Sequence, residues 1–265
     1  MKVGGLEIVP VLDGSARLPA ERLLRFTGAR DDPWGPHQGL LEPDGTLHLP
    51  LGGFLVRTGD RVVLVDTGVG RLETDTYRGG AFLDSLAGAG VTPAEVTDVV
   101  LTHLHFDHVG WTTQRGEIVF AHATYRCHAA DWDHFVAGPE PEEGSVRKLS
   151  PLAERLEPFA GDTTVVPGVS VRHAPGHTPG SAIVVVSDGP ERALLLGDAV
   201  HCPVELVEDE WEAIVDVDPA LGARTREALA RELEGTDVPV AGAHFPGMQF
   251  GRLLPGTGIR RWVFS

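Results

Sequence analysis

The feature that most constrains this chain is a cluster of metal-ligand side chains directly after an apolar segment. Residues 101–110 read LTHLHFDHVG, so His103, His105, Asp107 and His108 fall within six positions. Imidazole and carboxylate groups are the donors that zinc, manganese, iron and cobalt accept in proteins. We therefore expect an apolar strand to deliver this loop to a metal site.

The spacing inside the cluster indicates two ions. Side chains two residues apart in an extended segment point to the same side, so His103 and His105 can converge on one ion. A change of chain direction near Phe106 would let Asp107 and His108 face a second ion. The competing interpretation, a polar surface loop, suits one isolated histidine better than this dense pattern. The sequence thus predicts two divalent ions, zinc by default, with manganese, iron or cobalt as alternatives.

Apolar segments predict a core dominated by β-strands, with helices between them. The expected strands are Leu6–Leu12, Gly53–Thr58, Val62–Asp66, Val96–Thr102, Val165–Val171, Ala182–Ser187 and Ala193–Gly197. The expected helices are Ala81–Ala89, Ala129–Val136, Val146–Leu156 and Pro219–Leu233. Each half of the chain also has a hairpin that ends in an aspartate (Asp66 in VLVDTG, Asp198 in LLLGDA), then a helix and a strand that reaches a histidine. This recurrence predicts two similar βαβ halves.

Two segments are expected to be loops. Residues Leu24–Pro50 look irregular, and Phe26, Trp34 and Leu40–Leu41 within them could wall a pocket, together with Phe106 and Trp111. The segment Gly138–Gly144, GPEPEEG, is too acidic and turn-rich for a core, so it should be exposed as a loop or the stem of a lid.

Composition argues against several classes of partner. The chain has 22 Lys and Arg against 38 Asp and Glu, a formal charge of −16, and such a field repels phosphate backbones and anionic headgroups. No apolar stretch approaches the roughly 18 residues of a membrane span. Met1–Pro10 lacks the features of a signal peptide, which favours the cytoplasm. The two cysteines, Cys127 and Cys202, make no disulfide framework and are expected to be small buried hydrophobes.

These motifs resemble the signature of the metallo-β-lactamase-fold superfamily. The family pattern is an early Asp after a strand, then His-x-His-x-Asp-His, then three separate later ligands. In this chain the matching positions, in order, are Asp66, His103, His105, Asp107, His108, His177 in PGHTPGS, Asp198 in LLLGDA and His244 in VAGAHFP. The resemblance implies an α/β fold, a four-layer αββα sandwich of two similar halves, formed by residues 1–265 as one hydrolase domain.

The resemblance also implies how the ligands are shared. One ion is held by His103, His105 and His177, the other by Asp107, His108 and His244, and Asp198 bridges the two. Asp66 would orient ligands and loop backbone by accepting hydrogen bonds. A hydroxide between the ions would attack an ester or lactone carbonyl, since metal binding brings the pKa of water to about 7. The residues expected to act directly in catalysis are Asp107, Asp198 and His201.

The other candidate residues near the motifs are less specific. His201 stands three residues after Asp198, where related lactonases often carry a Tyr, and it could donate to the oxyanion or protonate an alkoxide. The alternative is a buried histidine bonded to backbone. Trp111 replaces a glycine of many relatives and suggests a more aromatic site mouth. His173 is expected to pack rather than bind metal. No role is assigned to His37, His48, His122, His128 and His134.

Within the superfamily, the motifs look most like the lactonase and organophosphate-hydrolase subgroups. The acidic chain lacks the basic face of nucleic-acid-processing members, and it shows no flavodoxin-like domain or signal peptide. The expected substrate is a small-molecule ester or lactone, and acyl-homoserine lactones are the first candidates. Neither nucleic acid nor a membrane is expected as a partner. A homodimer is possible. The alternatives are a phosphotriesterase or aryl-esterase with the same cluster, or a non-hydrolytic metal-binding or tailoring protein.

Overall fold

Two seven-stranded sheets form the centre of the chain, which the computed structural model describes over residues 1–265. The first sheet has the order β1-β2-β4-β5-β7-β10, with β6 paired to β2. Its strands are β1 (Lys2–Val3), β2 (Leu6–Pro19), β4 (Thr46–Thr58), β5 (Arg61–Val65), β6 (Tyr77–Arg78), β7 (Asp98–Val100) and β10 (Thr124–Arg126). The second sheet consists, in order, of β11 (Thr163–Val166), β12 (Val169–His173), β13 (Ala182–Asp188), β14 (Glu191–Leu195), β16 (Val240–Ala241), β17 (Gly251–Leu254) and β18 (Arg261–Phe264).

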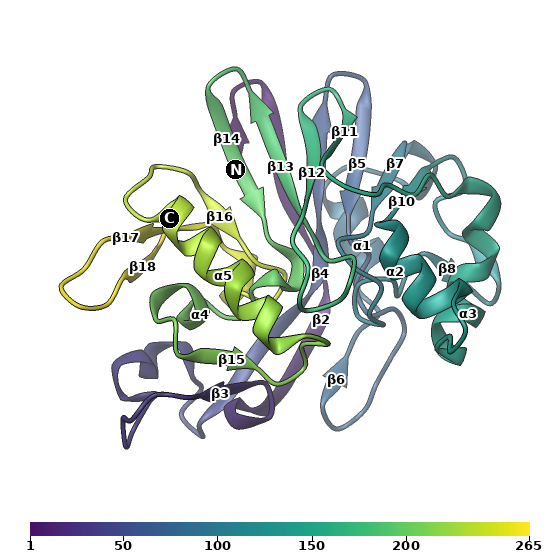
Figure 1. Cartoon of the computed structure of the whole chain (residues 1–265). Coiled ribbons are helices and arrows are strands. Elements are labelled where there is room, and N and C mark those ends of the chain that lie inside the picture. Colours follow the sequence, from purple (N-terminus) through teal and green to yellow (C-terminus); the bar gives the residue numbers. More distant parts are fainter.

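Helices cover the outer faces of both sheets. They are α1 (Phe82–Gly88), α2 (Ala129–Trp132), α3 (Glu143–Leu149), α4 (Val204–Val207) and α5 (Pro219–Leu233). Helices α2 and α3 lie on one side of the strands and α4 and α5 on the other (Figure 1). Two short ribbons complete the chain, β3 (Leu24–Phe26) with β15 (Trp211–Ala213), and β8 (Thr113–Gln114) with β9 (Glu117–Ile118).

Three apolar clusters account for the layers. Between the sheets, Val56 and Val65 of the first pack in one cluster with Val171 and Val184 of the second. A second cluster joins the outer face of the first sheet to α1, and a third joins the second sheet to α5. Consecutive β-branched residues, such as those of β13, suit a sheet that is buried on both faces. The predicted four-layer αββα sandwich is confirmed.

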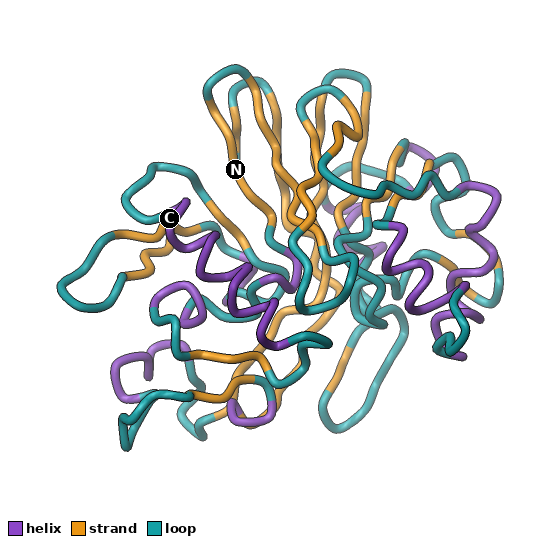
Figure 2. The backbone as a smooth tube through the Cα atoms, viewed as in Figure 1, coloured by secondary structure: helices purple, strands orange, loops and turns teal.

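The two halves share one topology. In the first, the hairpin β4–β5 is followed by α1 and by β7, which runs parallel to β5. In the second, the hairpin β13–β14 is followed by α4, α5 and β16, which runs parallel to β14. The prediction of two similar halves is therefore confirmed. Because the carboxyl ends of parallel strands share an edge, the loops after β5, β7, β14 and β16 can meet there; in Figure 2 the strands run into loops near the centre of the view.

The segment Leu24–Pro50 is only partly a loop, so that prediction was wrong in part. It contains β3, a 3₁₀ helix at Gly35–Leu40 and the start of β4. Trp34 and Phe26 pack against Trp211, with ring centroids 4.6 and 5.1 Å away. Long-range pairing forms both strands, since β3 pairs with β15 and β4 pairs with the extended β2, and local sequence does not show either pairing.

Two predicted helices also differ from the structure. The expected helix Ala129–Val136 is α2 followed by a π-helix at Asp133–Ala137. The expected helix Val146–Leu156 is α3 followed by a 3₁₀ helix at Ser150–Arg155, because Pro151 lacks the N–H that an α-helix needs. The segment Gly138–Gly144 is largely exposed, as expected, although α3 already begins at Glu143. None of the helices has the length and hydropathy required to cross a bilayer.

Candidate metal centre

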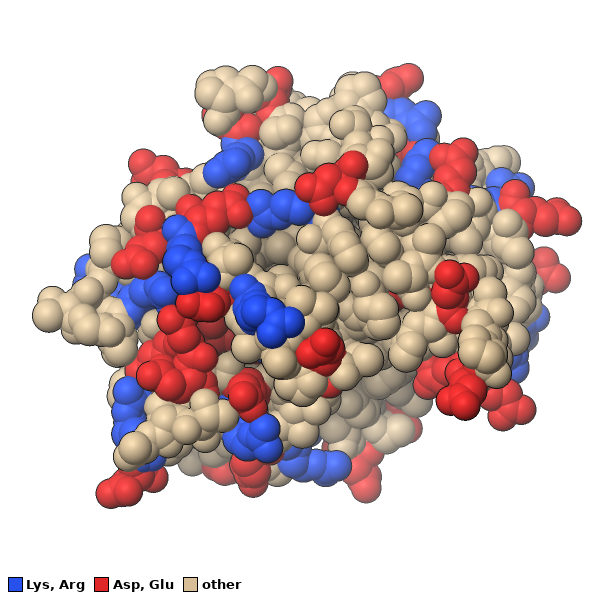
Figure 3. Space-filling view, in the orientation of Figure 1, with Lys and Arg blue, Asp and Glu red and all other residues tan.

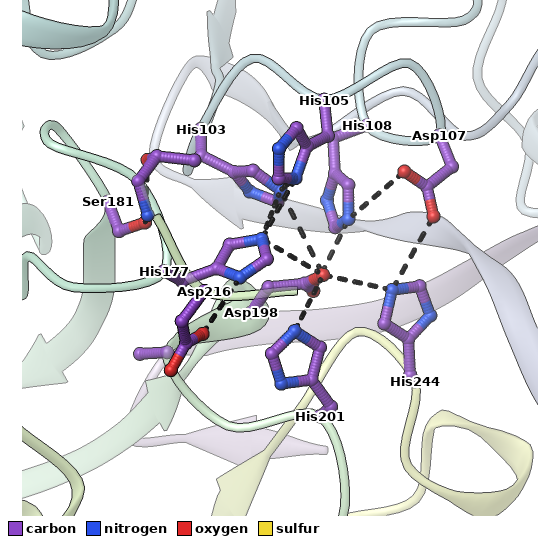
Figure 4. A network of polar contacts seen from close by, with 12 residues as sticks. His103, His105, Asp107, His108, His177, Ser181, Asp198, His201, Asp216 and His244 are labelled. Atoms are coloured by element: carbon purple, nitrogen blue, oxygen red, sulfur yellow. Dashed lines mark hydrogen bonds and ion pairs between the residues drawn. The ribbon is translucent and has the colours of Figure 1, made fainter. Parts of the chain in front are cut away.

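The loop after β7 presents the sequence cluster at the edge where the halves meet (Figure 4). His103 and His108 are buried, and Asp107 is partly exposed. Asp66, directly after β5, has a left-handed backbone (φ 62°) and accepts hydrogen bonds from Thr102 N at 2.8 Å and Thr102 Oγ1 at 2.7 Å. Its Oδ2 also lies 2.9 Å from His108 Nδ1. Asp66 thus contacts both ends of the loop, in agreement with the orienting role that the family resemblance implies.

Three imidazoles converge on one point. His103 Nε2 lies 3.1 Å from His105 Nδ1 and 3.2 Å from His177 Nε2, and His177 Nε2 lies 2.9 Å from His105 Nδ1. A neutral imidazole has one N–H, so three mutually facing nitrogens cannot all be paired by hydrogen bonds. Tetrahedral zinc with Zn–N bonds of about 2.0–2.1 Å requires nitrogens about 3.3 Å apart. The spacing therefore fits a shared cation.

A second group lies beside the first. His244 Nε2 is 3.6 Å from Asp107 Oδ2, and His108 Nε2 is 3.9 Å from Asp107 Oδ1. One ligand atom from each of these three residues lies within 4.8 Å of the others. His244 is held from behind, since its Nδ1 lies 3.0 Å from the carbonyl oxygen of Pro50. That contact places the N–H on Nδ1 and leaves Nε2 to face the site.

Asp198 lies between the two groups. Its Oδ1 is 3.3 Å from His108 Nε2, and its Oδ2 is 3.2 Å from His244 Nε2 and 3.7 Å from His177 Nε2. It follows β14 through Gly197, whose φ of 52° and contact with Thr102 leave no room for a Cβ. Every residue that the sequence assigned to the metal site is therefore brought together, with Asp198 central (Figure 4).

The protonation of the site residues differs between the three-histidine group and the group around Asp198. Burial, aided by His177, lowers the pKa of His105 to about 4, so this imidazole is neutral. Burial opposes the charge on His244, but the neighbouring Asp198 outweighs it and raises the pKa of His244 to about 9. Burial likewise opposes ionisation of Asp198, yet His244 and His108 hold its pKa well below the ordinary value. Carboxylates thus concentrate negative charge around His108 and His244, the charge that a cation would balance.

Unpartnered polar atoms complete the test of whether this site suits metal ions. His108 Nε2 and Asp198 Oδ1 are buried without a hydrogen-bond partner, and both point into the cluster. A buried polar atom without a partner costs about 1–3 kcal/mol, whereas a bound ion would satisfy it. Imidazole and carboxylate donors in this number fit divalent ions such as zinc. The residues therefore fit two adjacent ions.

Asp13 was missed by sequence reasoning. This wholly buried carboxylate accepts hydrogen bonds of 2.8–2.9 Å from the backbone N–H groups of Val69, Gly70, Gly80 and Phe82. Its Oδ1 also accepts from Trp111 Nε1 at 2.9 Å. Asp13 ties the loop after β5, the start of α1 and the end of the metal loop together. One aspartate in a β-strand gives no sequence signal for such a role.

Trp111 does not form a site mouth, so that prediction was wrong. Its indole is buried in the core beside α1 and bonded to Asp13. Directly before it, Gly110 packs so tightly on residues 68–70 that an added Cβ would lie 2.0 Å from Val69 C. The close backbone contact turns residue 111 inward.

His201 lies at the edge of the metal cluster. Its Nε2 is 3.6 Å from Asp198 Oδ2, its Nδ1 is 3.6 Å from Glu205 Oε1, and neither nitrogen has a hydrogen-bond partner. The alternative of a histidine bonded to backbone does not match this geometry. His173 packs as expected, stacked on His128 with ring centroids 4.1 Å apart. Cys127 and Cys202 are buried among apolar side chains, as predicted.

A cavity of about 510 Å³ opens onto the cluster. One side consists of His105, Asp107, His177, Asp198, His201 and His244. The rest is formed by Ala16, Leu18, Arg22, Leu23, Leu49, Leu51, Thr76, Tyr77, Phe106 and Val215. Of the predicted pocket walls, only Phe106 lines this cavity. Phe26 and Trp34 do not, because they pack on Trp211. Leu40–Leu41 line a different hollow, and Trp111 is buried beside α1.

The comparisons with known proteins match this description. Residues 53–242 fit the model of the metallo-beta-lactamase superfamily. The chain therefore belongs to this superfamily and is a metal-dependent hydrolase. It is 26% identical over 212 residues to an N-acyl homoserine lactonase of Bacillus sp., covering 72% of this chain and 81% of the relative. An N-acyl homoserine lactonase of Bacillus cereus is 27% identical over 212 residues, which again cover 72% of this chain and 81% of the relative.

Solved structures show the same fold. AidC, a dizinc quorum-quenching lactonase in complex with its product N-hexanoyl-L-homoserine, superposes with a TM-score of 0.84 at 23% identity. The match covers 100% of this chain and 96% of AidC. The hydrolase AbOPH of the β-lactamase superfamily has a TM-score of 0.83 at 23% identity, over 99% of this chain and 95% of its own.

Proposed function

We propose that this protein hydrolyses small-molecule lactones or esters, with N-acyl homoserine lactones as the first substrates to test. The observation that carries the proposal is a seven-ligand cluster opening onto a largely apolar cavity of about 510 Å³. The N-acyl homoserine lactonases among its relatives support the lactone class. In this proposal residues 1–265 act as one hydrolase domain in the cytoplasm.

The proposal assigns each ligand to an ion. His103, His105 and His177 hold one ion, Asp107, His108 and His244 the other, and Asp198 both. When bound, two divalent ions would polarise the substrate carbonyl and bring the pKa of water to about 7. Asp198, which lies between the two ligand groups, would accept the proton of the attacking water on its carboxylate. His201 Nε2 faces the same point and would donate a proton to the departing alkoxide.

The cavity walls favour an apolar acyl group. Leu18, Leu49 and Leu51 are among the residues that line the cavity, and burying apolar substrate surface against such walls contributes about 25 cal/mol per Å². Arg22 and Tyr77 add polar groups to the lining. On the face shown in Figure 3, basic side chains stand among acidic ones without forming a continuous basic surface. With a formal charge of −16, the protein would repel polyanions and accept small uncharged substrates.

The experiment is a rate panel with metal content measured on the same sample. The panel contains homoserine lactones of several acyl lengths, aryl esters, phosphotriesters, β-lactams and single-stranded RNA. We expect lactone or aryl-ester hydrolysis with about two ions per chain. Faster phosphotriester turnover would move the assignment to a phosphotriesterase. Two bound ions without turnover on any member would favour a metal-binding protein instead.

A further inference from the structure

Three charged side chains behind the site have no part in the proposed mechanism. Glu205 lies on α4, Arg226 on α5, and Asp216 in the loop between them. Arg226 and Glu205 are each 2% exposed, and Asp216 is 7% exposed. Buried charges are costly unless they are paired, so this arrangement requires an explanation.

Arg226 contacts both carboxylates. Its Nη2 donates to Asp216 Oδ2 at 2.6 Å, and its Nε forms an ion pair with Glu205 Oε1 at 3.4 Å, without hydrogen-bond geometry. A guanidinium presents its donors in a rigid planar fork, so one side chain can fix two carboxylates relative to each other. Arg226 therefore connects α4 to the loop before α5 through one ion pair with each.

Each carboxylate then reaches a different histidine of the site. Asp216 Oδ1 lies 3.2 Å from His177 Nδ1, which places the N–H there and leaves His177 Nε2 free for an ion. Glu205 Oε2 accepts from the backbone N–H of His201 at 2.6 Å, and its Oε1 lies 3.6 Å from His201 Nδ1. Figure 4 shows Asp216 next to His177, and His201 next to Asp198.

The packing of α5 supports the same connection. Gly222, inside this helix, leaves room for Asp216, since a Cβ there would lie 2.3 Å from Asp216 Oδ2. A Cβ on Gly176, directly before His177, would lie 2.3 Å from Gly222 Cα. A glycine within a helix costs about 0.5–1 kcal/mol relative to alanine, and here it allows the His177 loop to lie directly on α5.

We propose that Arg226 is a positioning residue that holds His177 and His201 in register through Asp216 and Glu205. The His177 branch sets ion affinity, because it fixes the tautomer and direction of a ligand. The His201 branch sets turnover, because it fixes the direction of the proton donor. The second branch rests on the proposed function, whereas the first requires only a bound ion.

The test compares three variants with one control. The variants are Asp216→Asn, Glu205→Gln and Arg226→Lys, where the single ammonium of lysine cannot pair both carboxylates in the same geometry. The control is Arg224→Lys, an exposed arginine two residues away on the same helix. Zinc affinity is measured by chelator competition, and kcat and KM are measured on the best substrate of the panel. Nitrogen NMR of the histidines reports the tautomer of His177 in each protein.

The two branches predict separable effects. Asp216→Asn should weaken zinc binding about 10–100-fold and change the His177 tautomer signal. Glu205→Gln should lower kcat about tenfold or more, with KM and zinc affinity within about twofold of wild type. Arg226→Lys should show both losses, and Arg224→Lys neither.

Other outcomes would overturn the proposal. If Arg226→Lys lowers only the melting temperature, with zinc affinity, His177 signal and kcat unchanged, the residue is merely structural. Equal loss of zinc affinity in Asp216→Asn and Glu205→Gln would contradict the separate branches. If wild type hydrolyses no ester, the proposed function fails, yet zinc affinity and the NMR signal still decide the His177 branch.

Discussion

Asp107 and His108 are adjacent in sequence and lie in the same group of candidate ligands as His244. Both lie within reach of His244, while the three-histidine group forms without them. We predict that Asp107→Ala and His108→Ala each remove chiefly one ion and leave the other site partly filled. Elemental analysis of variants reconstituted with zinc would show about one ion per chain. Loss of both ions, or retention of both, would contradict the division of ligands.

Asp131, which is not a candidate metal ligand, should make the stability of the protein depend on pH. This wholly buried carboxylate accepts from Thr178 Oγ1 at 2.9 Å and Gly180 N at 2.6 Å, next to His177 in the chain. Burial disfavours its charged form and raises its pKa from 3.8 to about 6. The folded state therefore holds this proton more tightly than the unfolded chain. The associated stability is fully present below pH 3.8 and is lost as the pH rises through about 6.

Asp131→Asn, whose amide does not titrate, separates this pH dependence of stability from that of the other groups. The rise in the pKa of Asp131 from 3.8 to about 6 corresponds to a free energy of about 3 kcal/mol. Between pH 4 and 7, the free energy of unfolding of wild type should fall by about that amount relative to Asp131→Asn. Urea denaturation of both proteins at several pH values measures the difference. A difference that is independent of pH would mean that Asp131 titrates normally.

At the scale of elements, Asp13 joins segments that are far apart in the chain. Its carboxylate binds residues 69–70, the start of α1 and Trp111. Asp13→Ala would leave several buried N–H groups unpaired, at about 1–3 kcal/mol each. We expect unfolding free energy to fall by at least about 3 kcal/mol in chemical denaturation. Asp84→Ala, an exposed residue of α1, is the control and should change stability by less than about 0.5 kcal/mol. Comparable losses in both variants would refute the role of Asp13.

Elements also show where sequence reasoning succeeded and failed. The hairpin, helix and parallel strand of each half were predicted, because their apolar runs and terminal residues are local features. The walls of the cavity were not, since Leu18 and Leu49 reach it through the pairing of β2 with β4. The inward turn of Trp111 likewise depends on a partner almost a hundred residues away, Asp13.

At the scale of the whole molecule, the cluster joins the two halves. His103 and His108 follow a strand of the first sheet, whereas Asp198 and His244 follow strands of the second. Bound ions should therefore stabilise the fold as well as support activity. A ligand present at 100 times its Kd raises the free energy of unfolding by about 2.7 kcal/mol. This gain corresponds to a rise of about 5 °C or more in melting temperature. Calorimetry with a chelator, and after zinc is restored, measures this shift. An unchanged melting temperature after complete metal removal would show that the halves hold together without ions.

Local sequence indicated the four candidate ligands at positions 103–108, and the family resemblance added His177, Asp198 and His244. Four ligand side chains on one short loop, and aspartates or histidines at the ends of apolar strands, are patterns that neighbouring residues create. Only the tertiary structure revealed the supports of those ligands: Asp13, Glu205, Asp216 and Arg226. Each is an ordinary charged residue in sequence, and its role arises from burial beside an opposite charge or a free N–H. Such pairing requires that distant segments meet, because the cost of a buried charge is removed only by a partner that the fold supplies.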